Sequence, residues 1–130
     1  MDANSIATCV IDSAVEIHRK IGPGLLDSVY ATSLADVLTE SGFTVERQES
    51  IPIQLRGRRF NQGPRAPLVV GGMVLVELKS LGSLSRVHKK QMLTYLKLSH
   101  LKHGLLINFG GELLNGNIER LENELDELAA

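Results

Sequence analysis

Residues 68–79 constrain the fold of this chain more than any other segment. Two apolar runs, 68–70 and 73–78, are separated by Gly71 and Gly72. A two-residue glycine turn between apolar runs predicts a β-hairpin. The second run is apolar on both faces, which is typical of a central strand. The hairpin is therefore expected to lie inside a sheet.

Helices are expected on both sides of this hairpin in the sequence. Apolar residues recur at spacings of three and four over 5–21, 26–38, 87–99 and 118–128. Asn4 or Ser5 is the expected N-cap of the first helix, and Gly42 suits the C′ position of the second. The last helix is predicted from Leu121 and Leu125, which are four residues apart, with a further leucine three residues on.

Further strands are expected before and after the hairpin. Alternating apolar residues predict two strands between Phe43 and Phe60, around a turn at Arg56 and Gly57, and the apolar run 105–109 predicts a buried strand. Helices followed by strands, a helix, a strand and a helix indicate an α/β fold with a mixed sheet. A chain of 130 residues without a linker is expected to form one domain, 1–130.

Composition narrows the class of protein. Hydrophobic residues make up 43% of the chain and charged residues 22%, so a core can form, but aromatics are 4% and tryptophan is absent. The core is therefore expected to be aliphatic. Cys9 is the single cysteine, which excludes a disulfide framework and favours a cytoplasmic location. The acidic start resembles no signal peptide, and no apolar run is long enough to span a membrane.

Positive charge is concentrated in the middle of the chain. Residues 47–103 carry eleven Lys and Arg against two acids, whereas 1–46 and 104–130 are both acidic. A local positive excess of this kind neutralises phosphates in nucleic-acid-binding proteins. The alternative is that these are ordinary solvated faces, partly covered by the acidic ends.

The end of the second hairpin strand carries the strongest candidates for catalytic residues. Strand alternation places Glu77 and Lys79 on one face with Leu75. Charges at the end of a buried strand need a partner, a metal or solvent. In phosphodiester hydrolysis, a carboxylate holds a divalent cation and a lysine orients the attacking water. The alternative is a plain Glu–Lys pair at an edge or exposed position.

Polar residues also share one face of the helix predicted over 87–99. His88, Gln91 and Tyr95 are three and four residues apart, so this face could lie beside the strand end. Alternatively, Tyr95 packs its ring in the core and Gln91 caps a backbone group. The four histidines of the chain have no spacing that predicts a zinc site.

Four segments of the chain together resemble the GxxExxY proteins, a family of the PD-(D/E)XK nuclease-like superfamily. They are IDSAVEIHRKIGPGLLDSVY, VLVELKS, VHKKQMLTYLKLS and HGLLINFG, which occur in the family order. The resemblance covers about residues 5–120 and implies a restriction-endonuclease-like αβββαβ core, with a central mixed sheet flanked by helices. It also implies magnesium-dependent nuclease ancestry.

The resemblance assigns residues to the family's motifs. The naming motif falls on Gly24, Asp27 and Tyr30, with aspartate in place of the usual glutamate, and the family's remaining site residues fall on Glu77, Lys79, Gln91 and Tyr95. One position departs from the family: Pro67 stands where relatives have a metal-binding aspartate. Asp27, Glu46 or Glu49 is a candidate replacement carboxylate.

Two classes of function follow. The first is a Mg²⁺- or Mn²⁺-dependent nuclease in which Glu77 and Asp27 hold the metal, Lys79 assists the attacking water, and Gln91 and Tyr95 position the substrate. The second is a degenerate nuclease fold that binds nucleic acid or a protein without cleaving, which Pro67 favours. In both, nucleic acid is the expected partner, DNA is favoured over RNA, no membrane is involved, and a homodimer is an open alternative. The residues expected to contact nucleic acid are Arg56, Arg58, Arg59 and Arg65.

Overall fold

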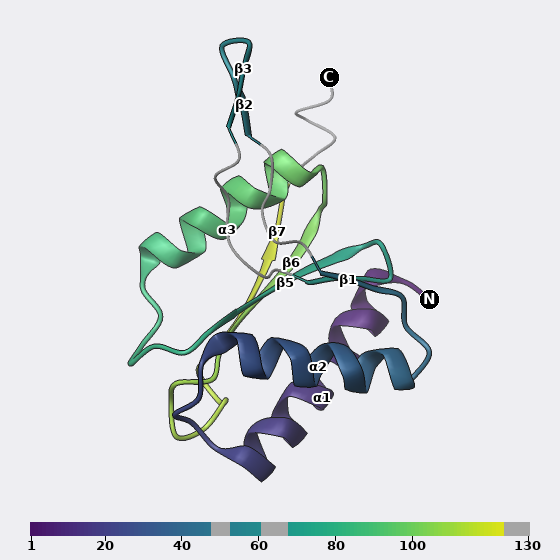
Figure 1. Cartoon of the computed structure of the whole chain (residues 1–130), viewed down its shortest axis with the longest axis vertical. Helices are drawn as coiled ribbons and strands as arrows, with labels where there is room; N and C mark the ends of the chain where they lie inside the picture. Colours follow the sequence, from purple (N-terminus) through teal and green to yellow (C-terminus); the bar gives the residue numbers. More distant parts are fainter. Residues whose placement is uncertain (48–52, 61–67, 124–130) are drawn as a thin grey trace.

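The computed structural model describes residues 1–47, 53–60 and 68–123 of the chain. The helices are α1 (Ala3–Ile21), α2 (Asp27–Glu40) and α3 (Arg86–Ser99). The strands are β1 (Val45–Arg47), β2 (Ile53–Leu55), β3 (Arg58–Phe60), β4 (Leu68–Val70), β5 (Val74–Lys79), β6 (His103–Asn108) and β7 (Ile118–Glu122). Five strands form one sheet in the order β1-β4-β5-β6-β7, and β2 pairs with β3 in a separate hairpin (Figure 1).

The sheet is mixed, as predicted. β5 and β6 run parallel, and the other three pairs of the sheet are antiparallel. Helix α3 makes the crossover connection that a parallel pair requires. Because β5 and β6 are parallel, their carboxyl ends lie at the same edge, where Lys79 is in register with Asn108.

Helices cover both faces of the sheet (Figure 1). One core cluster joins α1 and α2 to the β5 side chains Val74, Val76 and Leu78. A smaller cluster on the opposite face joins Leu75 to α3. The predicted alternation of β5 is therefore confirmed, and Glu77 and Lys79 belong to the face that α3 covers. The arrangement is an α/β fold consistent with the restriction-endonuclease-like class.

The starts of the first helix and of the hairpin follow from local chemistry. Asp2, rather than Asn4 or Ser5, caps α1: its Oδ1 accepts a hydrogen bond of 2.8 Å from the Ser5 backbone N–H, which lowers the pKa of Asp2. The hairpin turn contains both predicted glycines, whose φ angles are +63° and +69°, values that glycine readily adopts. The loop is one residue longer than predicted, because Val70 pairs with Val74 and Met73 belongs to the turn instead of to β5.

The segment between Phe43 and Phe60 forms three short strands instead of the two expected. The Arg56-Gly57 turn is confirmed, since it joins β2 to β3. β1, however, pairs with β4 in the main sheet. Alternation identifies extended chain but not its partner, so the sequence did not separate β1 from β2.

The helix expected over 118–128 is wrong for its first half, because residues 118–122 form strand β7, antiparallel to β6. Ile118 packs on the α1 and α2 side, whereas Leu121 packs on the α3 side. A spacing of three places two residues on opposite faces of a strand. Strand β7 thus partly buries both apolar side chains and also pairs with the edge of β6. Residues 124–130 lie outside the described chain.

In the described part of the chain, none of the helices has the length and apolar character needed to cross a bilayer.

Candidate functional site

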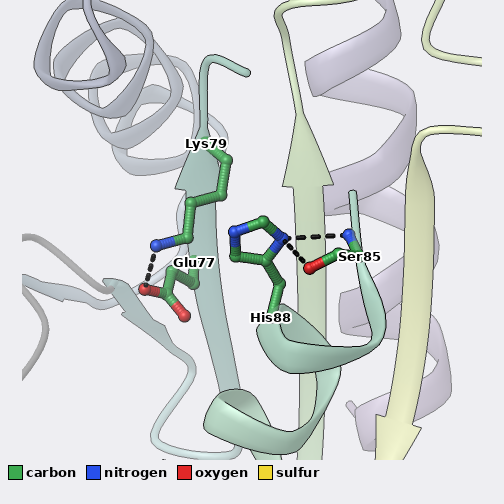
Figure 2. Close-up of polar contacts among 4 residues, drawn as sticks. All are labelled: Glu77, Lys79, Ser85 and His88. Atoms are coloured by element: carbon green, nitrogen blue, oxygen red, sulfur yellow. Dashed lines mark hydrogen bonds and ion pairs between the residues drawn. The ribbon is translucent and has the colours of Figure 1, made fainter. Parts of the chain in front are cut away.

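An ion pair lies at the carboxyl end of β5. Lys79 Nζ is 3.2 Å from Glu77 Oε1 (Figure 2). The Glu77 side chain is 4% exposed and the Lys79 side chain 25%. The alternative of an edge or exposed pair is wrong, because β5 is the third of five strands and α3 covers this face. The pair is therefore held in a desolvated environment, where electrostatic effects are strong.

Half of the Glu77 carboxylate has no partner. Its Oε2 atom is buried and accepts no hydrogen bond from the described residues. Burial raises the pKa of Glu77, and the positive charge and hydrogen bond of Lys79 oppose that rise. His88 and Asp27 have smaller effects in opposite directions: His88 lowers the pKa of Glu77, and Asp27 raises it. A buried oxygen of this kind is costly to a fold unless a cation or proton satisfies it.

His88 is brought to the pair by the start of α3. The Ser85 backbone N–H donates to His88 Nδ1 at 3.0 Å, and Ser85 Oγ lies 3.1 Å from the same nitrogen. These contacts form a capping box in which histidine takes the usual place of Glu or Gln. With Nδ1 as acceptor, the neutral ring carries its proton on Nε2. The ring lies between Ser85 and the Glu77–Lys79 pair (Figure 2).

A cleft of about 640 Å³ opens at this edge of the sheet. Its wall includes Lys79, His88 and Asp27, the first residue of α2. The other lining residues are Gly24, Leu25, Leu26, Ser80, Leu81, Gly82 and Gly110. The cleft thus combines one ammonium, one imidazole and one carboxylate, with Glu77 buried next to Lys79.

The motif Gly24-x-x-Asp27-x-x-Tyr30 shapes one wall of the cleft. Tyr30 is fully buried and stacks on Phe109, with ring centroids 4.3 Å apart. Its hydroxyl donates to the Gly22 carbonyl at 2.6 Å and accepts from the Leu25 backbone N–H at 3.2 Å. The tyrosine therefore clamps the loop that leads into Asp27, and its role in the described structure is positional.

Replacing Tyr30 by phenylalanine is expected to destabilise the fold while keeping the stacked ring. Two backbone groups lose their partner, so the free energy of unfolding should fall by about 1–2 kcal/mol. Thermal unfolding should show a midpoint roughly 5 °C lower. Tyr95→Phe is the matched control, because the Tyr95 hydroxyl has no hydrogen bond to the described residues. Equal midpoints for the two variants would contradict the clamp.

Asn108 fixes the backbone of Leu81 and Gly110, which line the cleft, and the sequence analysis did not identify this residue. This fully buried side chain accepts from the backbone N–H groups of Leu81 and Gly110, at 2.9 and 3.1 Å. Its amide donates to the Leu81 carbonyl and to Asn117 Oδ1, both at 3.1 Å. One side chain thus joins the segment after β5 to the segment after β6. The available signal was an asparagine inside the otherwise apolar run 105–109.

The two predicted residues of α3 differ in placement. Tyr95 is half-buried against the cluster that contains Leu75, and burial, with a contribution from the Glu77 charge, raises the pKa of Tyr95. The ring of Tyr95 thus packs in the core, as the alternative predicted, whereas the residue of this helix face that lines the cleft with Lys79 is His88. Gln91 is exposed.

The remaining predicted residues lie away from the cleft or outside the described chain. Arg56, Arg58 and Arg59 are exposed on the β2–β3 hairpin. Glu46 is exposed on the edge strand β1. Arg65, Pro67 and Glu49 fall outside the described residues.

A mixed sheet between helices, with a buried glutamate and a lysine at the end of a central strand, defines a nuclease-like α/β protein. A family model described as the PD-(D/E)XK nuclease superfamily matches residues 4–121, and the chain belongs to this superfamily. No curated protein and no solved structure matches the chain.

Nucleases of this superfamily commonly use divalent metal ions. Two carboxylates here fit such an ion: Glu77, whose buried Oε2 has no partner among the described residues, and Asp27, which lines the cleft. Magnesium is usually bound by one or two carboxylates, with waters and substrate phosphates as the other ligands. Within residues 1–47, 53–60 and 68–123, no three Asp, Glu, His or Cys side chains form a metal-binding group. The fit of the cleft to a metal ion therefore depends on the carboxylates of Glu77 and Asp27.

Proposed function

We propose that this chain is a divalent-metal-dependent nuclease that hydrolyses phosphodiester bonds in nucleic acid. The observation that carries the proposal is the buried Glu77 carboxylate, with one oxygen paired to Lys79 and the other without a partner in the described part of the chain. Membership of the nuclease superfamily supports the same conclusion. We further propose that the chain is a cytoplasmic GxxExxY protein whose 130 residues form one domain.

Each residue of the cleft has a role in this proposal. Glu77 and Asp27 would hold a Mg²⁺ or Mn²⁺ ion, which would supply Lewis acidity and activate a water. Lys79 lines the cleft, where its ammonium would orient the attacking water and stabilise negative charge that develops on the phosphate. Gln91 and Tyr95 position the substrate from α3.

The second candidate is a binding module that retains the fold without cleavage. It is favoured by Pro67, which stands where the family's metal-binding aspartate is expected. A proline side chain cannot ligate a metal, so this chain would have one ligand fewer than its relatives. In this case the basic residues of the chain bind nucleic acid, and Glu77 and Lys79 remain as an inherited ion pair.

Cleavage assays with Mn²⁺ on DNA and RNA distinguish the two candidates. We expect the native chain to cleave with Mn²⁺ and not in EDTA, and Lys79→Ala to lower the rate by about 10²–10³, since it removes charge stabilisation of the transition state. Lys97→Ala, which removes an exposed lysine elsewhere on α3, is the control. An inactive native chain together with an active Pro67→Asp variant would favour the binding module.

A further inference from the structure

The β2–β3 hairpin is a small positive element that stands away from the main sheet (Figure 1). It carries Arg56, Arg58 and Arg59, all of them exposed. No acidic side chain among the described residues forms an ion pair with these arginines. The hairpin therefore presents three guanidinium groups that the described residues leave without an acidic partner, which favours an anionic partner.

The tip of this hairpin has an unusual residue for its backbone conformation. Arg56 and Gly57 have φ angles of +52° and +77°, and the register pairs Leu55 with Arg58 around them. Two left-handed residues in a two-residue loop make a type I′ turn, for which Asn-Gly is the favoured pair. Arginine is disfavoured there because its Cβ crowds the following carbonyl. A charge at the tip is thus present despite a local conformational penalty, and such outliers indicate function.

The charges also surround the hairpin instead of lining one face. Arg58 and Arg59 are consecutive in β3, so their side chains leave opposite faces of the ribbon. Arg56 adds a third charge at the end. A flat anionic surface would meet only one of these faces. A groove with phosphates along both walls meets both faces and the tip together.

We propose that the β2–β3 hairpin inserts into the major groove of duplex DNA. Arg58 and Arg59 then face the phosphates of the two strands, and Arg56 points toward the base edges. The major groove of B-DNA is about 12 Å wide and admits a two-stranded ribbon. The major groove of A-form RNA is too deep and narrow for side chains to read. The inference rests on the proposed nucleic-acid function and names its substrate class.

Fluorescence anisotropy in EDTA tests the inference without cleavage. The probes are one labelled duplex DNA, the RNA duplex of the same sequence, and the single DNA strand, each titrated at 50 and 200 mM salt. We expect the DNA duplex to bind most tightly. Arg58→Gln and Arg59→Gln should each lower by about one the slope of log affinity against log salt concentration. The loss of affinity between the two salt concentrations should then be roughly threefold smaller than for the native chain.

The variant Arg56→Asn separates the contribution of Arg56 to DNA binding from its effect on folding. Asn-Gly suits the turn, so the thermal midpoint should stay the same or rise, while affinity for duplex DNA falls. Arg19→Gln is the control for charge, because Arg19 is exposed in the last turn of α1. Helix α1 ends at the opposite side of the molecule from the hairpin (Figure 1). The affinity of Arg19→Gln should match that of the native chain.

Each remaining outcome overturns a specific part of the argument. Equal affinity for the RNA duplex, or tighter binding of the single strand, would overturn the major-groove assignment. Duplex binding that is insensitive to all three arginine variants would overturn the role of the hairpin. Duplex binding that depends on the hairpin, without cleavage in Mn²⁺, would support this inference and refute the nuclease proposal. Absence of binding to every probe would refute the inference.

Discussion

Glu77→Gln is expected to abolish metal-dependent cleavage and, at the same time, to make the protein more stable. The amide keeps the shape of the side chain but loses the charge that would bind the metal. Loss of a catalytic metal contact of several kcal/mol corresponds to a decrease in rate of about three decades or more. A neutral amide is also less costly to bury than a carboxylate with an unpartnered oxygen. We expect the free energy of unfolding at pH 7 to rise by about 1 kcal/mol.

The stability gain should depend on pH in a defined direction. Burial raises the pKa of Glu77 in the folded protein above its ordinary value of 4.5. Below pH 4.5 the carboxyl is protonated in both states, so its full contribution to stability is present. As the pH rises through the folded pKa, the unfolded chain releases its proton more readily, and that contribution is lost. The advantage of Glu77→Gln over the native chain should therefore be absent near pH 4 and develop as the pH is raised.

Glu16→Gln is the matched control for this prediction. Glu16 also pairs with a lysine, Lys20 at 3.1 Å, but its side chain is 63% exposed on α1. An exposed pair contributes little to stability, so this variant should match the native chain in activity and within a few tenths of a kcal/mol in stability. Cleavage retained by Glu77→Gln would remove Glu77 from the reaction. A stability gain that did not vary with pH would contradict its desolvation.

Gly110→Ala is expected to cause the largest loss of stability from a single methyl group. A Cβ at this position would lie 2.0 Å from the Leu81 carbonyl oxygen and 2.5 Å from the Leu81 nitrogen. These are backbone atoms that Asn108 holds in place, so no side chain can rotate away to make room. We expect the free energy of unfolding to fall by about 3 kcal/mol. The thermal midpoint should fall by roughly 10 °C.

Gly82→Ala provides the comparison for Gly110→Ala within the same cleft. A Cβ at Gly82 would have no atom within 4 Å, so the substitution should be neutral or slightly stabilising through the unfolded state. Both variants should be measured by thermal unfolding and by cleavage. If Gly110→Ala were as stable as Gly82→Ala, the close contact between the segments that follow β5 and β6 would be refuted.

Local patterns in the sequence predict much of this fold. The hairpin of β4 and β5 follows from Gly71 and Gly72, and the faces of β5 follow from strict alternation. The failure at β7 has a physical cause: Leu121 fits a helical spacing, but the decisive factor is the unpaired edge of β6, which is a tertiary property. Propensity is overridden where a neighbouring strand offers hydrogen bonds and two apolar surfaces.

The candidate site was only partly visible in the sequence for a related reason. Glu77 and Lys79 are detectable because charges interrupt a buried strand. Asp27 was identified from the motif resemblance, which does not predict the residues that surround it in the fold. His88 was placed on the polar face of its helix, but only the fold brings it beside Lys79 in the cleft. Asn108 was given no role, because its partner Leu81 lies 27 residues earlier in the chain, in the segment that follows β5. Pairings of this kind require the topology to be known first.

The parallel pairing of β5 with β6 also determines when the cleft exists during synthesis. The chain emerges with its N-terminal part first, so Asp27, Glu77 and Lys79 all leave the ribosome before β6 does. Until β6 and Asn108 arrive, β5 has no parallel neighbour, and the backbone of Leu81 lacks its hydrogen bonds to Asn108. A nascent chain therefore carries the acidic and basic groups of the cleft without their geometry. The site is assembled only when strand β6, which follows its charged residues in the chain, has been translated.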